Sequence, residues 1–277
     1  MAHFKSIKGR PLVPLQPSLL MLDSYQEQLA LWNPFSKKGN ALCYQFRTGN
    51  EPFQFRQIPD GCVDFLFRLA PDQSAEFCGI GTSVRLHELK PDSLYFGFKP
   101  YSILGLRLRA SCCNELSAAR SVLLNDLLPS NAILHVLAES ETFEKRVEAI
   151  CSFARTQLAD PGHCPGLADL IEMKLCEVKG KISIEDINKD TFYSQRYCRE
   201  IFRNSLGVSQ KTYAGIMRFQ NTVRMYLNGQ DCLMDITYEN GYFDQAHFNH
   251  DFRRFCSNSP LNFFSSLQRL RQPSEKA

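Results

Sequence analysis

The sequence of 277 residues lacks any long hydrophobic run. Its apolar stretches, such as Leu19–Leu22, end after a few residues, whereas a helix that crosses a bilayer needs roughly 18–20. The N-terminus also lacks the apolar core of a signal peptide. We therefore expect no membrane segment and a cytoplasmic protein.

The sequence also lacks the cysteine spacing of metal and redox motifs. Its 11 cysteines include no C-x-x-C pair and do not alternate with histidine at zinc-finger intervals. An odd number of cysteines without a secretion signal argues against a disulfide framework. The adjacent pair Cys112 and Cys113 is either redox-active or simply buried as apolar thiols. We expect no cofactor and no metal site.

Neither sign of charge dominates, because the net charge is only +3. Hydrophobic residues make up 44% and charged residues 22%, which is average for a globular protein. This composition excludes a disordered chain, a collagen-like repeat and a coiled-coil rod. The net charge alone does not point to nucleic acid.

Residues 1–110 show the period-two alternation of half-buried antiparallel strands. We expect a strand with one face apolar at Val63, Phe65, Phe67 and Leu69, and with Asp64 and Arg68 on the outer face. Leu104, Leu106 and Leu108 alternate with small and basic residues and predict a second strand. Further strands are expected at 76–80, 83–89 and 94–98, so the region is predicted to be a small barrel or sandwich.

The period changes from 2 to 3.6 after Asn114. Apolar residues at helical spacing predict one helix over 114–127 and another over 142–158. A segment rich in Pro and Gly follows, which is typical of a linker. The predicted fold is α+β, with a β-rich sensor or dimerisation domain and its C-terminal helices at 1–160, a linker at 161–166 and an all-α domain at 167–272.

Five helices with clear capping residues are expected after Gly180. Ser183, Ser194, Ser209 and Asp244 can cap helices at their N-termini, and Gly207, Gly229 and Gly241 can end them. The helices form two helix-turn-helix modules joined by a long helix over 209–228. In such a module the second helix lies in the DNA major groove.

The two second helices carry polar side chains suited to base recognition. Arginine binds guanine bidentately, glutamine and asparagine bind adenine, and glutamate accepts from cytosine. The outer face of the first helix carries Gln195, Arg196, Arg199, Glu200 and Arg203, and that of the second carries Gln245, His247, Asn249, His250, Arg253 and Arg254. The helix N-termini at Ser194 and Asp244 can direct amides at phosphates, although the Asp244 carboxylate would repel one.

The long helix sets the distance between the two modules. Its 20 residues span roughly 30 Å at about 1.5 Å per residue. Successive major grooves on one face of DNA are about 34 Å apart. One chain can therefore read two neighbouring grooves.

The C-terminal residues resemble the signature of the AraC/XylS family of transcription regulators. The stretch Gly241–Pro260, followed by Phe263, resembles the family's C-terminal signature, and Ser194–Arg203 with Leu206–Tyr213 resembles the first module and the start of the linker helix. Arg218 and Gln220 stand where the linker motif has its Arg and Gln. The resemblance covers Lys174–Leu270.

The resemblance implies which side chains face DNA bases. They are Arg196, Arg199 and Glu200 in the first module and Gln245, Ala246, His247 and His250 in the second. Six positions depart from the family pattern. Asn188 and Thr237 replace a small Ala, Asn240 a Val and Ser257 a turn Gly, while Glu200 and His250 occupy positions that are often basic.

The N-terminal region resembles the sensor domain of a subset of the family. The cues are Pro59–Phe67, Gly79–Gly81 and Ile103–Arg109. The resemblance implies a bacterial regulator, activator or repressor, whose partners are double-stranded DNA, RNA polymerase, a small-molecule effector and a second copy in a homodimer.

Two other classes of function stay open beside a DNA-binding regulator. One is an interaction protein whose helical half has lost DNA affinity. The other is an enzyme, including a DNA-repair methyl acceptor, although no catalytic residues can be nominated and the cysteine spacing does not fit the repair protein's zinc site. We expect a sequence-specific DNA-binding regulator and not an enzyme.

Overall fold

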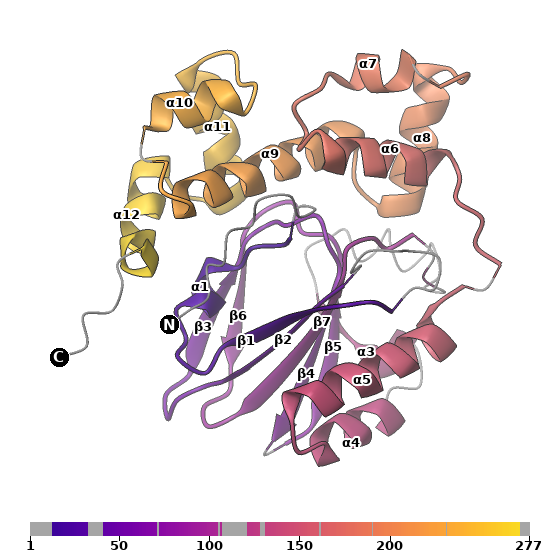
Figure 1. Ribbon diagram of the computed structural model, residues 1–277, viewed down its shortest axis with the longest axis vertical. Coiled ribbons are helices and arrows are strands. Elements are labelled where there is room, and N and C mark those ends of the chain that lie inside the picture. The colour runs from indigo at the N-terminus through magenta and orange to yellow at the C-terminus, as the bar shows by residue number, and fades with distance from the viewer. Residues whose placement is uncertain are drawn as a thin grey trace.

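The structure is a computed structural model that describes residues 13–32, 41–70, 72–104, 106, 121–127, 131–160, 162–189, 191–230 and 232–271. A β-rich N-terminal region is followed by helices, which confirms the predicted α+β class (Figure 1). The elements of the first region are α1 (Pro17–Leu20), β1 (Gln26–Ala30), β2 (Ala41–Arg47), β3 (Phe53–Gln57), β4 (Asp64–Ala70), β5 (Ser74–Cys78), β6 (Arg85–Leu89), β7 (Leu94–Pro100), β8 (Ser121–Leu123), α3 (Leu124–Leu127), α4 (Asn131–Glu139), α5 (Phe143–Phe153) and the π-helical turn η1 (Ala154–Leu158).

The helical region continues to the end of the described chain. Its elements are α6 (Leu167–Glu177), α7 (Ile184–Lys189), α8 (Gln195–Leu206), α9 (Gln210–Leu227), α10 (Leu233–Glu239), α11 (Gln245–Cys256) and α12 (Pro260–Arg271). Within the described residues, no helix combines the length and the apolar character that a membrane crossing requires.

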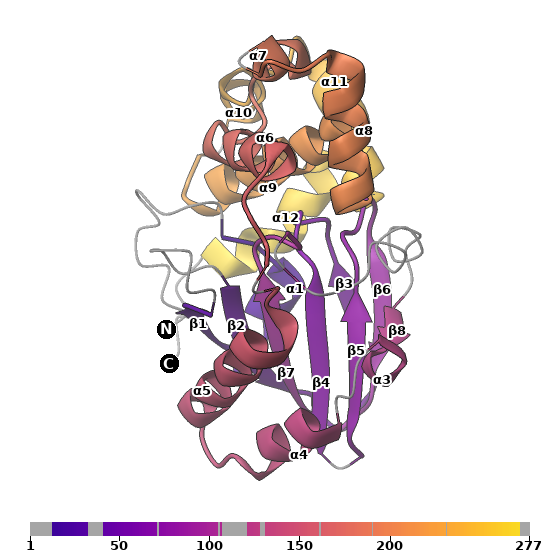
Figure 2. The ribbon, with the colours of Figure 1, turned by 90° about the vertical axis from the view of Figure 1, so that its right-hand side faces the viewer.

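Two antiparallel sheets form the β-rich region. One has six strands in the order β1-β2-β7-β4-β5-β8, and the other pairs β3 with β6. Aromatic side chains fill the space between the sheets, including Tyr44, Phe46, Phe55 and Tyr95. The other face of the large sheet carries Phe65, Phe67, Phe96 and Phe98, which belong to the same core as the helices α4 and α5 beside it (Figure 2).

The face of β4 that was expected to be exposed is instead buried. The Asp64 carboxylate accepts hydrogen bonds from the Tyr44 hydroxyl at 2.8 Å and from Gln57 Nε2 at 3.1 Å, and it lies 3.2 Å from Lys99 Nζ. Arg68, on the same face, is half-buried. The prediction was wrong because the β3–β6 sheet covers this face, which alternation along a single strand does not reveal.

Two further expectations near residue 110 are corrected. Ser102–Leu104 is a turn rather than a strand, and Leu106 makes only an isolated bridge with Ala159. Ser121–Leu123 extends the large sheet as β8 beside β5, so in the described part of the helix expected over 114–127 only Leu124–Leu127 is helical, as α3. Leu108, Cys112, Cys113 and the start of that helix lie outside the described residues.

The helix expected over 142–158 is confirmed. Thr142 caps α5, since its side chain accepts from the Lys145 amide, and the last turn widens to the π-helical η1. Five apolar side chains of this helix are buried, namely Phe143, Val147, Ile150, Ala154 and Leu158.

Helix α9 lies between the β-rich region and the helices α7 and α10 (Figure 1). Gln220 of α9 donates to the Pro59 carbonyl at 2.8 Å and accepts from the Leu15 amide at 2.9 Å. Arg224, one turn further on, donates to the Val13 carbonyl. These contacts attach the middle of the helical region to the N-terminal region.

Candidate DNA-binding surface

Helices α8 and α11 are the second helices of the two predicted modules and are called the reading helices below. They begin at the predicted N-capping residues Ser194 and Asp244. Ser194 accepts a hydrogen bond from the Tyr197 amide at 3.3 Å, and Asp244 accepts from the His247 amide at 2.7 Å. Each helix ends in a left-handed residue, Gly207 with φ 76° and Ser257 with φ 54°. Ser257 therefore adopts the conformation for which glycine is the usual choice.

The predicted base-facing side chains lie on the solvent side of these helices. The apolar sides of α8 and α11 are buried at Cys198, Phe202, Leu206, Phe248, Phe252 and Phe255. Of the thirteen predicted contact residues, twelve are exposed, namely Ser194, Gln195, Arg196, Arg199, Glu200, Arg203, Gln245, Ala246, His247, His250, Arg253 and Arg254. Asn249 is half-buried.

Buried amides join the first helix of each module to α9. Asn188 at the end of α7 and Gln210 exchange hydrogen bonds at 3.3 and 3.4 Å. Asn240, which caps the C-terminus of α10, accepts from Asn221 at 2.6 Å. Thr237 is buried too and donates to the Leu233 carbonyl. The polar departures from the family pattern are therefore satisfied inside the domain, as buried polar groups must be.

Arg218 of α9 contacts α11 on the side that faces away from the exposed polar residues. Its guanidinium donates to the Gly180 carbonyl at 2.8 Å and lies 3.4 Å from the Asp251 carboxylate and 5.2 Å from the Tyr242 ring centroid. Asp251 belongs to α11, so the contact fixes how that helix rotates about its axis. Asp251 was not predicted as a site residue, because it lies on the flank between the exposed and buried faces of α11.

Helix α8 packs near the start of α9, where Gln210 donates to the Cys198 carbonyl at 3.1 Å, and α11 packs across the middle of α9, where the ring of Phe219 contacts Phe252 and Phe255 (Figure 1). The 18 residues of α9 span about 27 Å at 1.5 Å per residue. Viewed after a quarter turn, α8 and α11 project on the same side of α9 (Figure 2).

Exposed aromatic side chains that were not predicted as site residues flank the starts of both reading helices. Phe192 is completely exposed, and Phe243 is 88% exposed. Tyr193 and Tyr197 form a pair with ring centroids 5.2 Å apart. Aromatic residues are usually buried in the core, and the spacing of residues in the sequence does not reveal that these four side chains are exposed.

Histidines of α11 lie near a carboxylate but do not form a metal site. His247 Nε2 is 3.7 Å and His250 Nδ1 3.8 Å from the Asp251 carboxylate. Among the described residues, no cluster of three or more His, Cys, Asp or Glu side chains could hold a metal ion.

Comparison with known proteins identifies the helical region. Residues 188–266 match the family model described as a helix-turn-helix domain. No curated protein matches the chain.

Three solved structures are similar to the chain at low identity. ToxT from Vibrio cholerae O395 is 12% identical with a TM-score of 0.46, and the match covers 88% of this chain and 98% of that one. Unsaturated-fatty-acid-bound wild-type ToxT from V. cholerae strain SCE256 is 10% identical with a TM-score of 0.43, covering 91% and 98%. The C-terminal domain of AraT, a response regulator from Geobacillus stearothermophilus, is 16% identical with a TM-score of 0.35, covering 41% and 92%.

The family match includes α8, α9, α10 and α11. These helices contain both reading helices and the long helix α9 between the two modules. Residues 188–266 thus form a helix-turn-helix domain, in agreement with the resemblance of Lys174–Leu270 to the AraC/XylS family.

Proposed function

We propose that the chain is a sequence-specific DNA-binding transcription regulator that reads two adjacent major grooves with α8 and α11. The observation that carries the proposal is the presence of two exposed polar helix faces, on α8 and α11, that both pack against one 18-residue helix. The full length of α9, about 27 Å, does not set the distance between α8 and α11, because α11 packs across the middle of α9.

The side chains of each reading helix have separate proposed roles. Arg196, Arg199 and Gln245 are suited to bidentate contacts with guanine or adenine, and Glu200 to accepting from cytosine. The amides at the start of α8, beside Ser194, are suited to a phosphate. The complete proposed contact set is Ser194, Gln195, Arg196, Arg199, Glu200, Arg203, Gln245, Ala246, His247, Asn249, His250, Arg253 and Arg254.

We further propose that residues 1–160 form a regulatory domain, joined by 161–166 to a DNA-binding domain at 167–272. The hydrogen bonds of Gln220 and Arg224 to this first region support the proposal, because they connect it to the helix that spaces the modules. Control by a small-molecule effector, contact with RNA polymerase and homodimerisation belong to the same proposal.

Selection from a pool of randomised duplexes tests the proposed function. We expect purified chain to enrich a site with two half-sites about one helical turn apart and to lose affinity steeply as salt rises. Arg196→Ala and Gln245→Ala should each weaken binding to that site by about 10- to 100-fold and relax base preference at one position.

The variants need a control for general charge and for folding. Lys145→Ala removes a positive charge from α5, outside the proposed surface, and should leave both affinity and base preference unchanged. Thermal unfolding of all three variants should match the parent chain. Enrichment of no site, or equal losses in all three variants, would contradict the proposal.

A further inference from the structure

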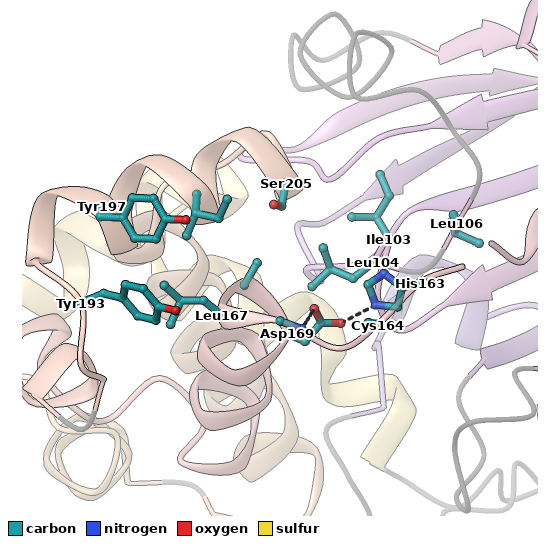
Figure 3. Close-up of a pocket in the computed structure, with 13 residues that line it drawn as sticks. Ile103, Leu104, Leu106, His163, Cys164, Leu167, Asp169, Tyr193, Tyr197 and Ser205 are labelled. Atoms are coloured by element: carbon teal, nitrogen blue, oxygen red, sulfur yellow. Dashed lines mark hydrogen bonds and ion pairs between the residues drawn. The ribbon is translucent and has the colours of Figure 1, made fainter. Parts of the chain in front are cut away.

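A pocket of about 390 Å³ lies where the N-terminal region, the segment before α6 and the reading helix α8 meet (Figure 3). Ile103, Leu104 and Leu106 line it from the N-terminal region. Tyr197, Ile201 and Ser205 line it from α8. Its volume lies within the range of small-molecule sites, about 300–1,000 Å³. The contacts described so far do not use this pocket.

The pocket presents two aromatic rings and apolar side chains beside polar groups that cover about as much of its surface. Tyr193 and Tyr197 are about half exposed, and their rings are inclined by 34° to each other. Leu104 and Leu167 belong to the same lining, as Figure 3 shows. Aromatic surfaces of this kind favour a planar ring that stacks in an offset or edge-on arrangement.

The polar groups of the pocket are paired with one another. His163 Nε2 lies 2.9 Å from one oxygen of Asp169, and the other oxygen accepts from the Gly166 amide at 2.9 Å. No lysine or arginine occurs among the described residues that line the pocket. Among these described residues, a ligand with a carboxylate, sulfonate or phosphate would meet the Asp169 carboxylate and no lysine or arginine in exchange for its lost hydration.

We propose that this pocket binds an uncharged aromatic effector, with its ring against Tyr193 and Tyr197. Binding at the pocket follows from its lining alone. The regulatory consequence rests on the proposed DNA-binding function.

The position of the pocket on α8 gives the effector a route to the DNA-reading face. Tyr197, Ile201 and Ser205 follow one another at intervals of four and share one stripe of the helix. The arginines at 196, 199 and 203 form a different stripe, so a bound effector does not occupy the DNA-reading face. The N-terminal region forms the other wall of the pocket. The effector therefore binds most tightly to one position of α8 relative to that region, and it raises the fraction of molecules with α8 in that position.

Fluorescence titration of the full chain with N-phenyl-1-naphthylamine tests the site without DNA. This uncharged probe brightens when it leaves water, and 1-anilinonaphthalene-8-sulfonate has the same ring system with an added sulfonate. We expect saturable binding of the uncharged probe that is about tenfold tighter than that of the sulfonate, since the charged group lacks a partner.

Variants locate the bound probe. Ser205→Phe should fill the pocket and Tyr197→Ala should remove a stacking surface, and each should weaken probe binding by about tenfold. Tyr238→Ala, which removes a tyrosine of similar exposure on α10, should leave binding unchanged. Binding that the sulfonate matches, or that neither pocket variant weakens, would overturn the site, and Tyr197→Ala keeps the test valid if Ser205→Phe does not fold.

Titration of the selected duplex with and without saturating probe tests the regulatory step. We expect the probe to change the dissociation constant for DNA by about fivefold or more in the parent chain and not in Ser205→Phe. An unchanged constant in the parent would overturn the regulatory role. Probe binding by a chain that binds no duplex would refute the proposed DNA-binding function and support the pocket.

Discussion

At the scale of single residues, Gly97 shows how closely side chains pack on one face of the large sheet. It lies on β7 directly opposite Tyr44 of β2, and the Tyr44 ring crosses the position where a side chain would be. A Cβ atom at residue 97 would lie 2.0 Å from Tyr44 Cζ. The ring has no room to move, because Tyr44 is fully buried and donates its hydroxyl hydrogen to Asp64.

Gly97→Ala should therefore lower the free energy of unfolding by about 3 kcal/mol, at the upper end of the cost of overpacking. Denaturant unfolding followed by circular dichroism measures the change. Gly49→Ala is the matched control, since a Cβ there has nothing within 4 Å, and its effect should stay within about 0.5 kcal/mol. Equal effects of the two substitutions would show that Tyr44 does not occupy this space.

At the scale of secondary-structure elements, capping residues made the helical region predictable. Ser194, Ser209 and Asp244 begin α8, α9 and α11 as expected, because a cap is a local hydrogen bond that sequence alone can specify. Helix α12 was not expected, although Pro260 suits the first position of a helix.

Elements that depend on distant partners were less predictable. β2 is buried along almost its whole length, since both of its faces are covered, so it shows no alternation of apolar and polar residues. β8 forms because β5 offers an edge, and the local sequence has helical periodicity instead. The exposed polar faces of α8 and α11 could be predicted from the sequence. The contact between Arg218 and Asp251 and the pocket between the N-terminal region and α8 could not, because both depend on tertiary contacts.

The cap of α9 gives a test at this scale. Ser209 accepts from the Thr212 amide at 3.1 Å, so Ser209→Ala should lower the free energy of unfolding by about 1 kcal/mol. Ser209→Asn keeps a capping oxygen and should restore most of the loss. Equilibrium unfolding in urea measures both, and equal destabilisation by Ala and Asn would argue against the cap.

At the scale of the whole molecule, a buried carboxyl group joins three segments. Glu172 of α6 accepts from the Ser102 hydroxyl at 2.5 Å and from the Tyr213 hydroxyl of α9 at 3.0 Å. Burial raises its pKa to about 7, an effect that these two hydrogen bonds oppose and that the nearby Asp169 carboxylate increases. Below a pH of about 7, the protonated form of Glu172 therefore predominates at this junction between the N-terminal region and the helices.

The raised pKa makes stability depend on pH in a definite direction. A carboxyl group whose pKa is higher in the folded state binds its proton more tightly there, so its contribution to stability is complete below its ordinary pKa of 4.5. That contribution is lost as the pH rises to about 7. At 1.36 kcal/mol per pH unit, the loss amounts to about 3 kcal/mol.

Glu172→Gln should remove this dependence, since the amide does not titrate. The difference in free energy of unfolding between Glu172→Gln and the parent chain should rise by about 3 kcal/mol from about pH 4.5 to pH 8, in favour of the variant. His163, Asp169, Cys176 and Tyr213 lie in the same region but are present in both proteins, so to first order their titration cancels in the difference. Urea unfolding at several pH values gives the difference directly, and a difference that stays constant with pH would show that Glu172 is ionised inside the fold.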